Sequence, residues 1–242
     1  MGIGYNSLNL PTELAIKNIN ANGKTYYTYS ASGVKLKVMH KNAKNMNYTP
    51  VMGTSGDSNL EDAKITDYAG NKVYENGALK RILVDGGYIE NSKYHYYLKD
   101  HLGNNRVVVD QYNNPIQSTQ FYPFGMSFAE STDQNKQPYK YNGKEQDKMY
   151  GLNWYDYSAR QYEASFGRFL SIDPLAEKYY SISPYVYCGN NPIIFIDPDG
   201  RMFGPPEWLQ KVKSTLHSFA ETFTPLRPET KEERSTREAK YG

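Results

Sequence analysis

The side chains best placed to do chemistry lie in one Tyr- and Asn-rich segment, residues 150–201. It contains Arg160 and two Asp-Pro steps, which begin at Asp173 and Asp197. Two carboxylates held close together cannot both ionise, so such a pair can keep a proton on one group and use the other to activate water. A guanidinium nearby can hold a peptide or lower the pKa of one carboxyl. These three residues are therefore the candidate site.

Each of the three also has a structural interpretation. Asp173 stands where a helix N-cap would, with proline at the next position. Asp197 begins an Asp-Pro-Asp-Gly turn, for which both residue types are suited. Arg160 can stack on the surrounding tyrosines or pair with Asp156 or Glu163. Both interpretations stay open at this point.

Other titratable residues lack the spacing of a site. His101 follows Asp100 in an expected hairpin turn, with no serine or cysteine nucleophile nearby. The remaining histidines are scattered, without metal-ligand spacing: His40, His95 and His217. Cys188 is the single cysteine, so an internal disulfide and a multi-thiolate metal site are excluded, and we expect a small buried residue. No metal and no cofactor is predicted.

The charge balance disfavours several classes of partner. The chain has 28 basic and 26 acidic residues, spread along its length, which indicates no nucleic-acid surface. No apolar run approaches the roughly 18 residues of a membrane span. The first residues, MGIGYNSLNLPTELAIKN, lack a signal-peptide pattern. We expect any export to depend on an upstream part of a longer protein, or on a route that needs no such signal.

The elements before residue 130 are predicted to be β-hairpins. The chain has 24 tyrosines, and only Tyr241 lies beyond residue 187; tyrosine suits pleated surfaces. Strand-like runs flank D-x-x-G or S-x-x-G turns, which end at Gly33, Gly70 and Gly103. Such hairpins cannot bury a face alone and must stack side by side. We expect mainly antiparallel β structure over 20–200, with tyrosines stacked along one face.

The later elements are mixed. Residues 39–60 are predicted to be a loop or a decayed repeat, 174–181 a short helix and 193–196 a buried strand. From 205 the apolar period becomes helical, which predicts a helix over 206–223. This helix is either the start of a tail that packs on the rest or a membrane-active element.

Several motifs occur in the order of one family. They are YYLKDHLGNNRVV, FYPFG, YNGKE, the W-Y-D-Y-x-A-R-x-Y block, GRF-x-S-x-DP and GNNP-x-x-x-x-DPDG. Tyr27, Ser30 and Gly33 align with Tyr97, Asp100 and Gly103 as degenerate YD repeats. The chain therefore resembles bacterial Rhs/YD-repeat proteins of the polymorphic toxin class. It divides into degenerate YD-repeat hairpins and loop at 1–63, an RHS repeat-associated core domain at 64–201 and a variable C-terminal tail at 202–242.

The resemblance implies a fold and a site. The YD-repeat sheet spirals into a hollow shell, and the core domain plugs one end. In many members the core acts as an aspartic autoprotease that releases the enclosed toxin. On this basis Arg160, Asp173 and Asp197 match the catalytic positions, and the cut falls between Arg201 and Met202. The chain departs from the family pattern at Ala176, where many relatives have glycine, and by one extra residue between the aspartates.

Three functions follow from the resemblance. The first is structural: a C-terminal fragment of a shell that encloses and presents a downstream toxin. The alternative is a single-turnover autoprotease. The third, that residues 201–242 are themselves the effector, ranks last because the segment is short and has no catalytic grouping. The implied partners are the upstream shell or the chain's own tail, and a toxin or immunity protein. A secreted or cell-surface location is implied, and a cut-out sheet should have an unpaired edge and self-associate.

Overall fold

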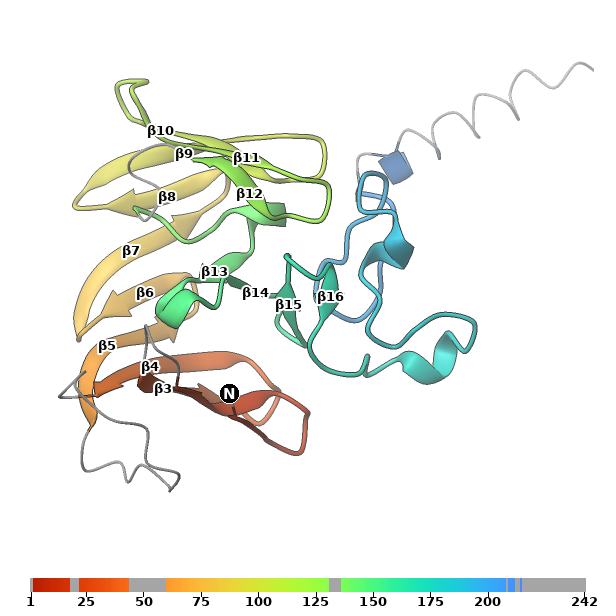
Figure 1. Ribbon diagram of the computed structural model, residues 1–242. Helices are drawn as coiled ribbons and strands as arrows, with labels where there is room; N and C mark the ends of the chain where they lie inside the picture. The colour runs from red at the N-terminus through yellow and green to blue at the C-terminus, as the bar shows by residue number, and fades with distance from the viewer. Residues whose placement is uncertain are drawn as a thin grey trace, which may run out of the picture. The chain divides into compact units, whose positions relative to one another are not determined.

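The structure is a computed structural model that describes residues 2–17, 22–43, 60–130, 136–207, 209–211 and 214. The chain divides into two compact units, Met1–Gly204 and Pro205–Gly242. The first holds all the strands that the structure describes (Figure 1). In the second, the described residues from Glu207 onward are helical. The rest of the helix predicted over 206–223 lies outside the described residues, as does His217.

One twelve-stranded sheet dominates the first unit. Its strands pair in chain order from β1 to β12, and every pair is antiparallel. The strands are β1 (Gly2–Tyr5), β2 (Pro11–Lys17), β3 (Asn22–Tyr29), β4 (Lys35–Ala43), β5 (Leu60–Ala69), β6 (Lys72–Glu75), β7 (Ala78–Val84), β8 (Gly87–Glu90), β9 (Lys93–Lys99), β10 (Asn105–Asp110), β11 (Pro115–Phe121) and β12 (Ser127–Glu130). The predicted fold class, mainly β with antiparallel hairpin repeats that form part of a spiralling shell and a short C-terminal helix, is confirmed.

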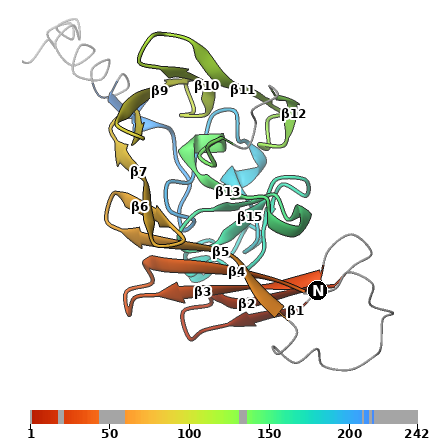
Figure 2. The ribbon, with the colours of Figure 1, turned by 90° about the vertical axis from the view of Figure 1, so that its left-hand side faces the viewer.

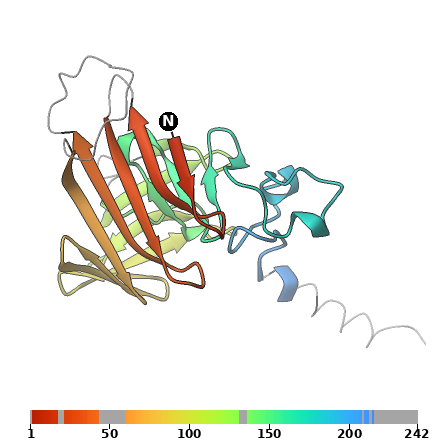
Figure 3. The ribbon, with the colours of Figure 1, turned by 90° about the horizontal axis from the view of Figure 1, so that it is seen from below.

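The sheet is strongly curved (Figure 2). Its strands twist progressively, as right-handed strand twist requires, so that β1–β4 and β9–β12 form the two ends of a wall (Figure 3). The strand β13 (Glu145–Asp147) lies inside this curve. The described part of the sheet does not close on itself, so β1 and β12 each have one edge without a partner strand.

Several of the hairpins share one type of turn. In the turns that begin at Ser30 and Asp100, the backbone N–H of the first residue donates to the carbonyl oxygen of the fifth. The backbone N–H of the fourth residue donates to the carbonyl oxygen of the first. The Asp100 carboxylate also accepts the backbone N–H groups of Leu102 and Asn104. Gly33 and Gly103 have φ of 83° and 80°, which explains the glycine at the fourth position. The alignment of these two repeats is confirmed.

The third proposed repeat is different. Asp67 lies inside β5, paired with Tyr74, and does not begin a turn. The turn beginning at Asp110 has instead the same bonds as the one at Asp100, with Asn113 at the left-handed position (φ 66°). Asparagine adopts this conformation more readily than most residues. Because the turn has asparagine where the other two have glycine, a sequence pattern that requires glycine at the fourth position misses it.

Two further sequence predictions about the sheet are wrong, one of them only in part. Of the loop or decayed repeat predicted at 39–60, Met39–Ala43 belongs to β4, because the strand has partners on both β3 and β5, and Leu60 begins β5. The rest of that prediction, 44–59, lies outside the described residues. Tyrosines occupy both faces: on β9 the exposed rings of Tyr94 and Tyr96 stack on each other, whereas Tyr97 packs near Tyr88. Adjacent residues of a strand point to opposite faces, so runs such as Tyr96–Tyr97 must divide between them.

A second, four-stranded sheet carries Arg160 in the turn between two of its strands. It comprises β13, β14 (Trp154–Asp156), β15 (Gln161–Glu163) and β16 (Arg168–Phe169). Its aromatic core consists of Tyr141, Tyr155, Tyr157, Tyr162, Phe169 and Tyr187.

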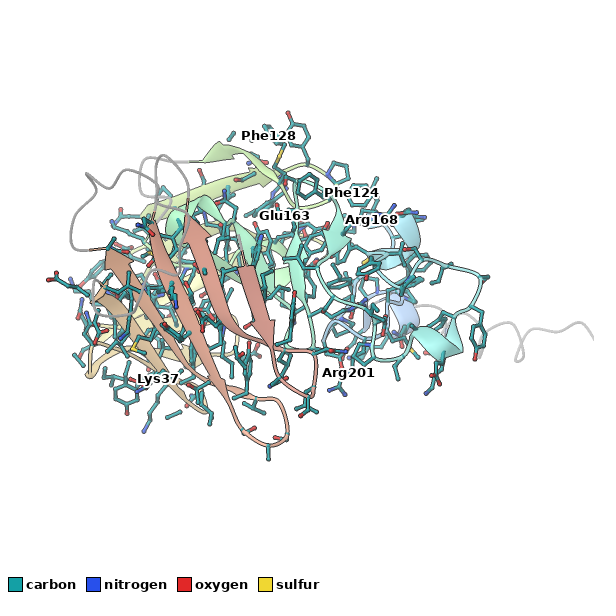
Figure 4. The ribbon with its side chains drawn as sticks, turned by 60° about the horizontal axis from the view of Figure 1, so that its bottom comes forward. Lys37, Phe124, Phe128, Glu163, Arg168 and Arg201 are labelled. Carbon is teal, nitrogen blue, oxygen red and sulfur yellow. The ribbon has the colours of Figure 1, made fainter. Side chains whose placement is uncertain are left out.

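Tyrosine hydroxyl groups attach this core to the large sheet. Those of Tyr141, Tyr162 and Tyr155 donate in turn to the carbonyl oxygens of Pro123, Phe124 and Gly125, at 2.7, 2.7 and 3.2 Å. These three consecutive carbonyls belong to the turn between β11 and β12, and Figure 4 shows Phe124 there, beside Arg168 of β16. Tyrosine buries its ring and uses its hydroxyl for a specific bond, which phenylalanine could not do.

The region after β16 has little regular structure. The predicted helix over 174–181 is reduced to a 3-10 turn, Ala176–Lys178. Residues 193–196 are not a buried strand: Ile193 and Ile194 are about half exposed, and Ile196 makes one bridge, to Gly204. Neither segment forms a ladder of backbone bonds, and Arg160 bonds instead to residues that flank them, Asp173, Pro184 and Asp197.

Candidate functional site

Arg160 ends the turn between β14 and β15 and points into the protein. Its carbonyl accepts the backbone N–H of Tyr157, which closes the turn. The side chain is 2% exposed and its guanidinium lies 3.6 Å from the centroid of the Phe169 ring. A planar guanidinium suits this position because it stacks on the ring and keeps its N–H groups free for acceptors in its own plane.

Four acceptors surround the guanidinium. Nε donates to the carbonyl of Gly200 at 2.5 Å, and Nη1 to that of Pro184 at 3.0 Å. Nη2 lies 2.8 Å from Oδ2 of Asp173 and 3.4 Å from Oδ2 of Asp197. All three predicted site residues therefore meet at one nitrogen. The alternative partners do not: Asp156 pairs with Lys35, and Glu163 accepts bonds from Ser165.

Asp173 serves two purposes in this arrangement. Its Oδ1 accepts the backbone N–H of Leu175 at 2.7 Å, and its backbone carbonyl accepts that of Ala176. These bonds form a local turn at the Asp-Pro step rather than the predicted helix N-cap, because the 3-10 turn that follows has Leu175 at its N-cap and no side-chain cap bond. Because only Oδ1 is used in the turn, Oδ2 remains available for Arg160. The structural and the site interpretations of Asp173 are thus compatible.

Asp197 is buried more deeply, with an exposed fraction of 2%. Its Oδ1 accepts three backbone N–H groups, from Asp199, Gly200 and Arg201, at 3.3, 2.8 and 3.2 Å. Burial raises the pKa of Asp197 above its ordinary value, although the three N–H groups and Arg160 act in the opposite direction. Burial likewise lowers the pKa of Arg160, against the pull of both carboxylates. A proton taken up at this site would therefore be stabilised on Asp197.

The predicted cut lies in a loop whose ends are tied together. The backbone groups of Ile196 and Gly204 exchange two hydrogen bonds at 2.9 Å. Gly200 has φ of 78°, and a Cβ there would stand 3.0 Å from the Tyr157 carbonyl oxygen. Past this close approach the chain turns outward: about half of the Arg201 side chain is exposed, as is about half of Met202 (Figure 4).

The remaining candidates of the sequence lie elsewhere or have structural partners. Cys188 is buried, which raises the pKa of its thiol to about 12 and disfavours a thiolate. His101 contacts the Ile193 carbonyl, and His40 bonds to Thr25. His95 stacks on Tyr88. Among the described residues, no group of His, Cys, Asp and Glu is placed to hold a metal ion, and no helix is long and apolar enough to span a membrane.

A second charged cluster was not foreseen. Lys35, at the start of β4, contacts both Glu145 of β13 and Asp156 of β14, at 2.8 and 2.5 Å. Tyr68 donates to the other oxygen of Glu145. These residues line a cavity of about 670 Å³ between the large sheet and residues 136–161. The sequence carries no local signal for this cluster, because it depends on how two sheets meet.

Comparisons with known proteins identify similar chains. No protein-family model matches. Salivary gland surface protein 1 of Aedes aegypti is 37% identical over 118 residues, which are 48% of this chain and 3% of that protein. Toxin subunit YenC1 of Yersinia entomophaga is 30% identical over 133 residues, 52% of this chain and 13% of the relative. The tRNA3(Ser)-specific nuclease WapA of Bacillus spizizenii is 32% identical over 184 residues, which are 72% of this chain and 7% of that protein.

The fold also occurs among solved structures. The crystal structure of TcdB2-TccC3-Cdc42 matches 82% of this chain and 10% of its own, with a TM-score of 0.63 at 20% identity. This chain therefore spans only a small part of its relatives' length. From the order of the motifs, the open hairpin sheet and these relatives together, the chain belongs to the Rhs/YD-repeat protein family.

Proposed function

We propose that this chain is a C-terminal piece of an Rhs/YD-repeat shell that encloses and presents a downstream toxin. The observation that carries the proposal is the twelve-stranded meander without a crossover, which has an unpaired edge at β1 and another at β12 in its described part. Each edge offers backbone donors and acceptors to a further antiparallel strand. Residues 64–201 would be the core region and 202–242 the variable tail.

The names of the relatives agree with this role. YenC1 is a toxin subunit and WapA a nuclease, and both are much longer than the matched segment. By analogy, the partners of this chain would be other shell hairpins or its own tail, together with a toxin or immunity protein. Its location would be secreted or at the cell surface, as part of a larger protein.

Self-association through the free edges tests the shell role. Phe128 of β12 is exposed at the last strand (Figure 4). We expect the full chain to form concentration-dependent oligomers in light scattering and Phe128→Lys to reduce them, since charge at an edge opposes strand addition. The control is Tyr112→Lys, an exposed aromatic in the turn between β10 and β11. A strictly monomeric wild-type chain at high concentration would contradict the proposal.

A second function, autoproteolysis, is favoured by one specific observation. Asp173 and Asp197 contact the same nitrogen of Arg160, and Asp197 also accepts the backbone N–H of Arg201, at the expected cut. One carboxylate could activate water for attack on the Arg201 carbonyl while the other, protonated, donates to the departing amine. Proteolysis would then separate residues 202–242 from the shell.

The intact mass of the purified chain tests this second function. If the site is active, the mass falls by that of residues 202–242, and either Asp173→Asn or Asp197→Asn restores the full mass. Asp199→Asn is the matched control, because Asp199 lies in the same loop but its side chain is about half exposed and pairs with Arg201 rather than with Arg160. A wild-type chain that keeps its tail after prolonged incubation would leave only the structural function.

A further inference from the structure

The cluster of Lys35, Glu145 and Asp156 has the composition and geometry of a site at which a lysine amine could condense with a neighbouring carboxyl group. We propose that the amine of Lys35 and the carboxyl group of Asp156 form an intramolecular amide bond, assisted by Glu145, which joins the large sheet covalently to the small one. The bond would link β4 to β14. It would be a modification site independent of Arg160 and of the proposed toxin-related function.

Proximity is the first argument. Nζ of Lys35 lies 2.5 Å from Oδ2 of Asp156 and 2.8 Å from Oε2 of Glu145. All three side chains are largely buried, with 15 to 20% of each exposed. Lys35 opens β4 and Asp156 closes β14, so both reactants are held on strands. Reactants fixed in this way lose little further entropy on approach, which favours a reaction that is negligible between free amines and acids in water.

The positions of the two carboxyl groups are the second argument. Glu145 and Asp156 are direct partners across the β13–β14 pair, so their side chains share a face. Like charges placed opposite each other are unfavourable, and one lysine leaves the trio with one excess negative charge. Tyr68 donates to Oε1 of Glu145 at 2.7 Å, and the Lys35 amine lies 4.7 Å from the centroid of its ring. The tyrosine thus orients the base and covers the amine.

The reaction balances without another reagent. Burial lowers the pKa of Lys35, but the two carboxylates raise it by more, so its pKa lies above the ordinary value. Burial raises the pKa of Asp156, but Lys35 lowers it, so its pKa lies below the ordinary value. The resting state is therefore an ion pair. Condensation begins when the ammonium passes a proton to Oδ2 of Asp156. The neutral amine then attacks Cγ, Glu145 removes a proton from nitrogen and delivers it to the departing Oδ2 hydroxyl, and one water leaves. Glu145 returns to its starting carboxylate.

The surroundings stabilise the intermediate. Oδ1 of Asp156 accepts the backbone N–H of Ser158 at 2.7 Å. When Cγ becomes tetrahedral, negative charge develops on this oxygen, and a donor already in place stabilises it. The water produced can leave through the cavity that the three residues line. Each oxygen of Asp156 therefore has a defined part: Oδ1 carries the charge and Oδ2 departs.

Mass spectrometry of the full chain in denaturant tests the proposal. We expect the wild-type mass to be lower than the sequence mass by one water, and trypsin to yield residues 25–37 joined to residues 149–160. Lys35→Arg, which keeps the charge, should have the full mass. Glu145→Gln, which keeps both reactants, should lose most of the condensation.

Two outcomes would overturn the proposal. One is a wild-type chain of full mass in which trypsin cleaves after Lys35 and releases the separate peptides 25–35 and 149–160. The other is a water loss found within a single linear peptide and retained in Lys35→Arg, because an Asp-Gly step such as Asp85–Gly86 or Asp199–Gly200 can lose water by forming a cyclic imide. Circular dichroism of each variant confirms that it is folded before its mass is interpreted.

Discussion

Nε of Arg160 donates a hydrogen bond to the carbonyl oxygen of Gly200, 40 residues later in the chain, at 2.5 Å. With the bonds to Pro184, Asp173 and Asp197, one side chain connects four points of a region that has little regular structure. Arg160 therefore acts as the main internal support of residues 173–204, whether or not the two aspartates also do chemistry. The consequences for stability can be measured.

Replacing Arg160 should destabilise the protein strongly. Arg160→Leu leaves the buried Asp197 and the largely buried Asp173 without their counter-charge, and removing one partner of a buried ion pair costs about 3–5 kcal/mol. The free energy of unfolding in urea measures the loss. Arg168→Leu is the control, because Arg168 is an exposed arginine of the neighbouring strand. Equal effects of the two substitutions would show that Arg160 is not the support inferred here.

Asp197 should make stability depend on pH in an unusual direction. Its pKa is raised in the folded protein, so between the unfolded value of about 3.9 and the raised value the folded state binds the extra proton. The contribution of this group is thus full below the unfolded pKa and is lost as pH rises through the folded pKa. We expect the stability of wild type relative to Asp197→Asn to fall as pH increases upward from about 4. Urea titrations of the two proteins at a series of pH values measure this difference, and a difference that grows or stays constant above pH 4 would contradict the expectation.

Gly200 should be intolerant of a side chain for two reasons that a control can separate. Gly200→Ala forces alanine into φ of 78° and brings its Cβ to 3.0 Å from the Tyr157 carbonyl oxygen. Gly77→Ala meets the same backbone strain, at φ of 82°, but no atom lies within 4 Å. Strain costs about 1–2 kcal/mol. Thermal unfolding should show a larger loss for Gly200→Ala, and a loss no greater than that of Gly77→Ala would refute the close approach.

The tyrosine hydroxyl groups should contribute individually to the attachment between the two sheets. Tyr162→Phe keeps the ring but leaves the Phe124 carbonyl without its 2.7 Å donor. An unsatisfied buried acceptor costs about 1–3 kcal/mol. Tyr180→Phe changes an almost fully exposed residue and should have no effect on the free energy of unfolding. If the two variants were equally stable, the hydroxyl bonds would be dispensable and ring packing alone would hold the turn.

Much of the fold followed from the sequence because hairpins are local. The turns at Ser30 and Asp100 are specified by residues within five positions, and alternation of polar and apolar residues specifies the strands beside them. The order of the motifs also indicated the family and pointed to Arg160, Asp173 and Asp197 as one group. These inferences needed no knowledge of which strands end up far apart or close together.

The tertiary structure decided what depends on distant segments. Residues 174–181 and 193–196 have local patterns of helix and strand, yet the first forms only the 3-10 turn Ala176–Lys178 and the second only a bridge from Ile196 to Gly204. The carbonyls of Pro184 and Gly200 are acceptors that no side-chain pattern can reveal, since every residue has one. Lys35 meets Glu145 and Asp156 only because the register of β13 with β14 places both acids on the face that meets β4. Sequence patterns record the preferences of neighbouring residues, whereas contacts across two sheets are selected by the free energy of the whole packed arrangement.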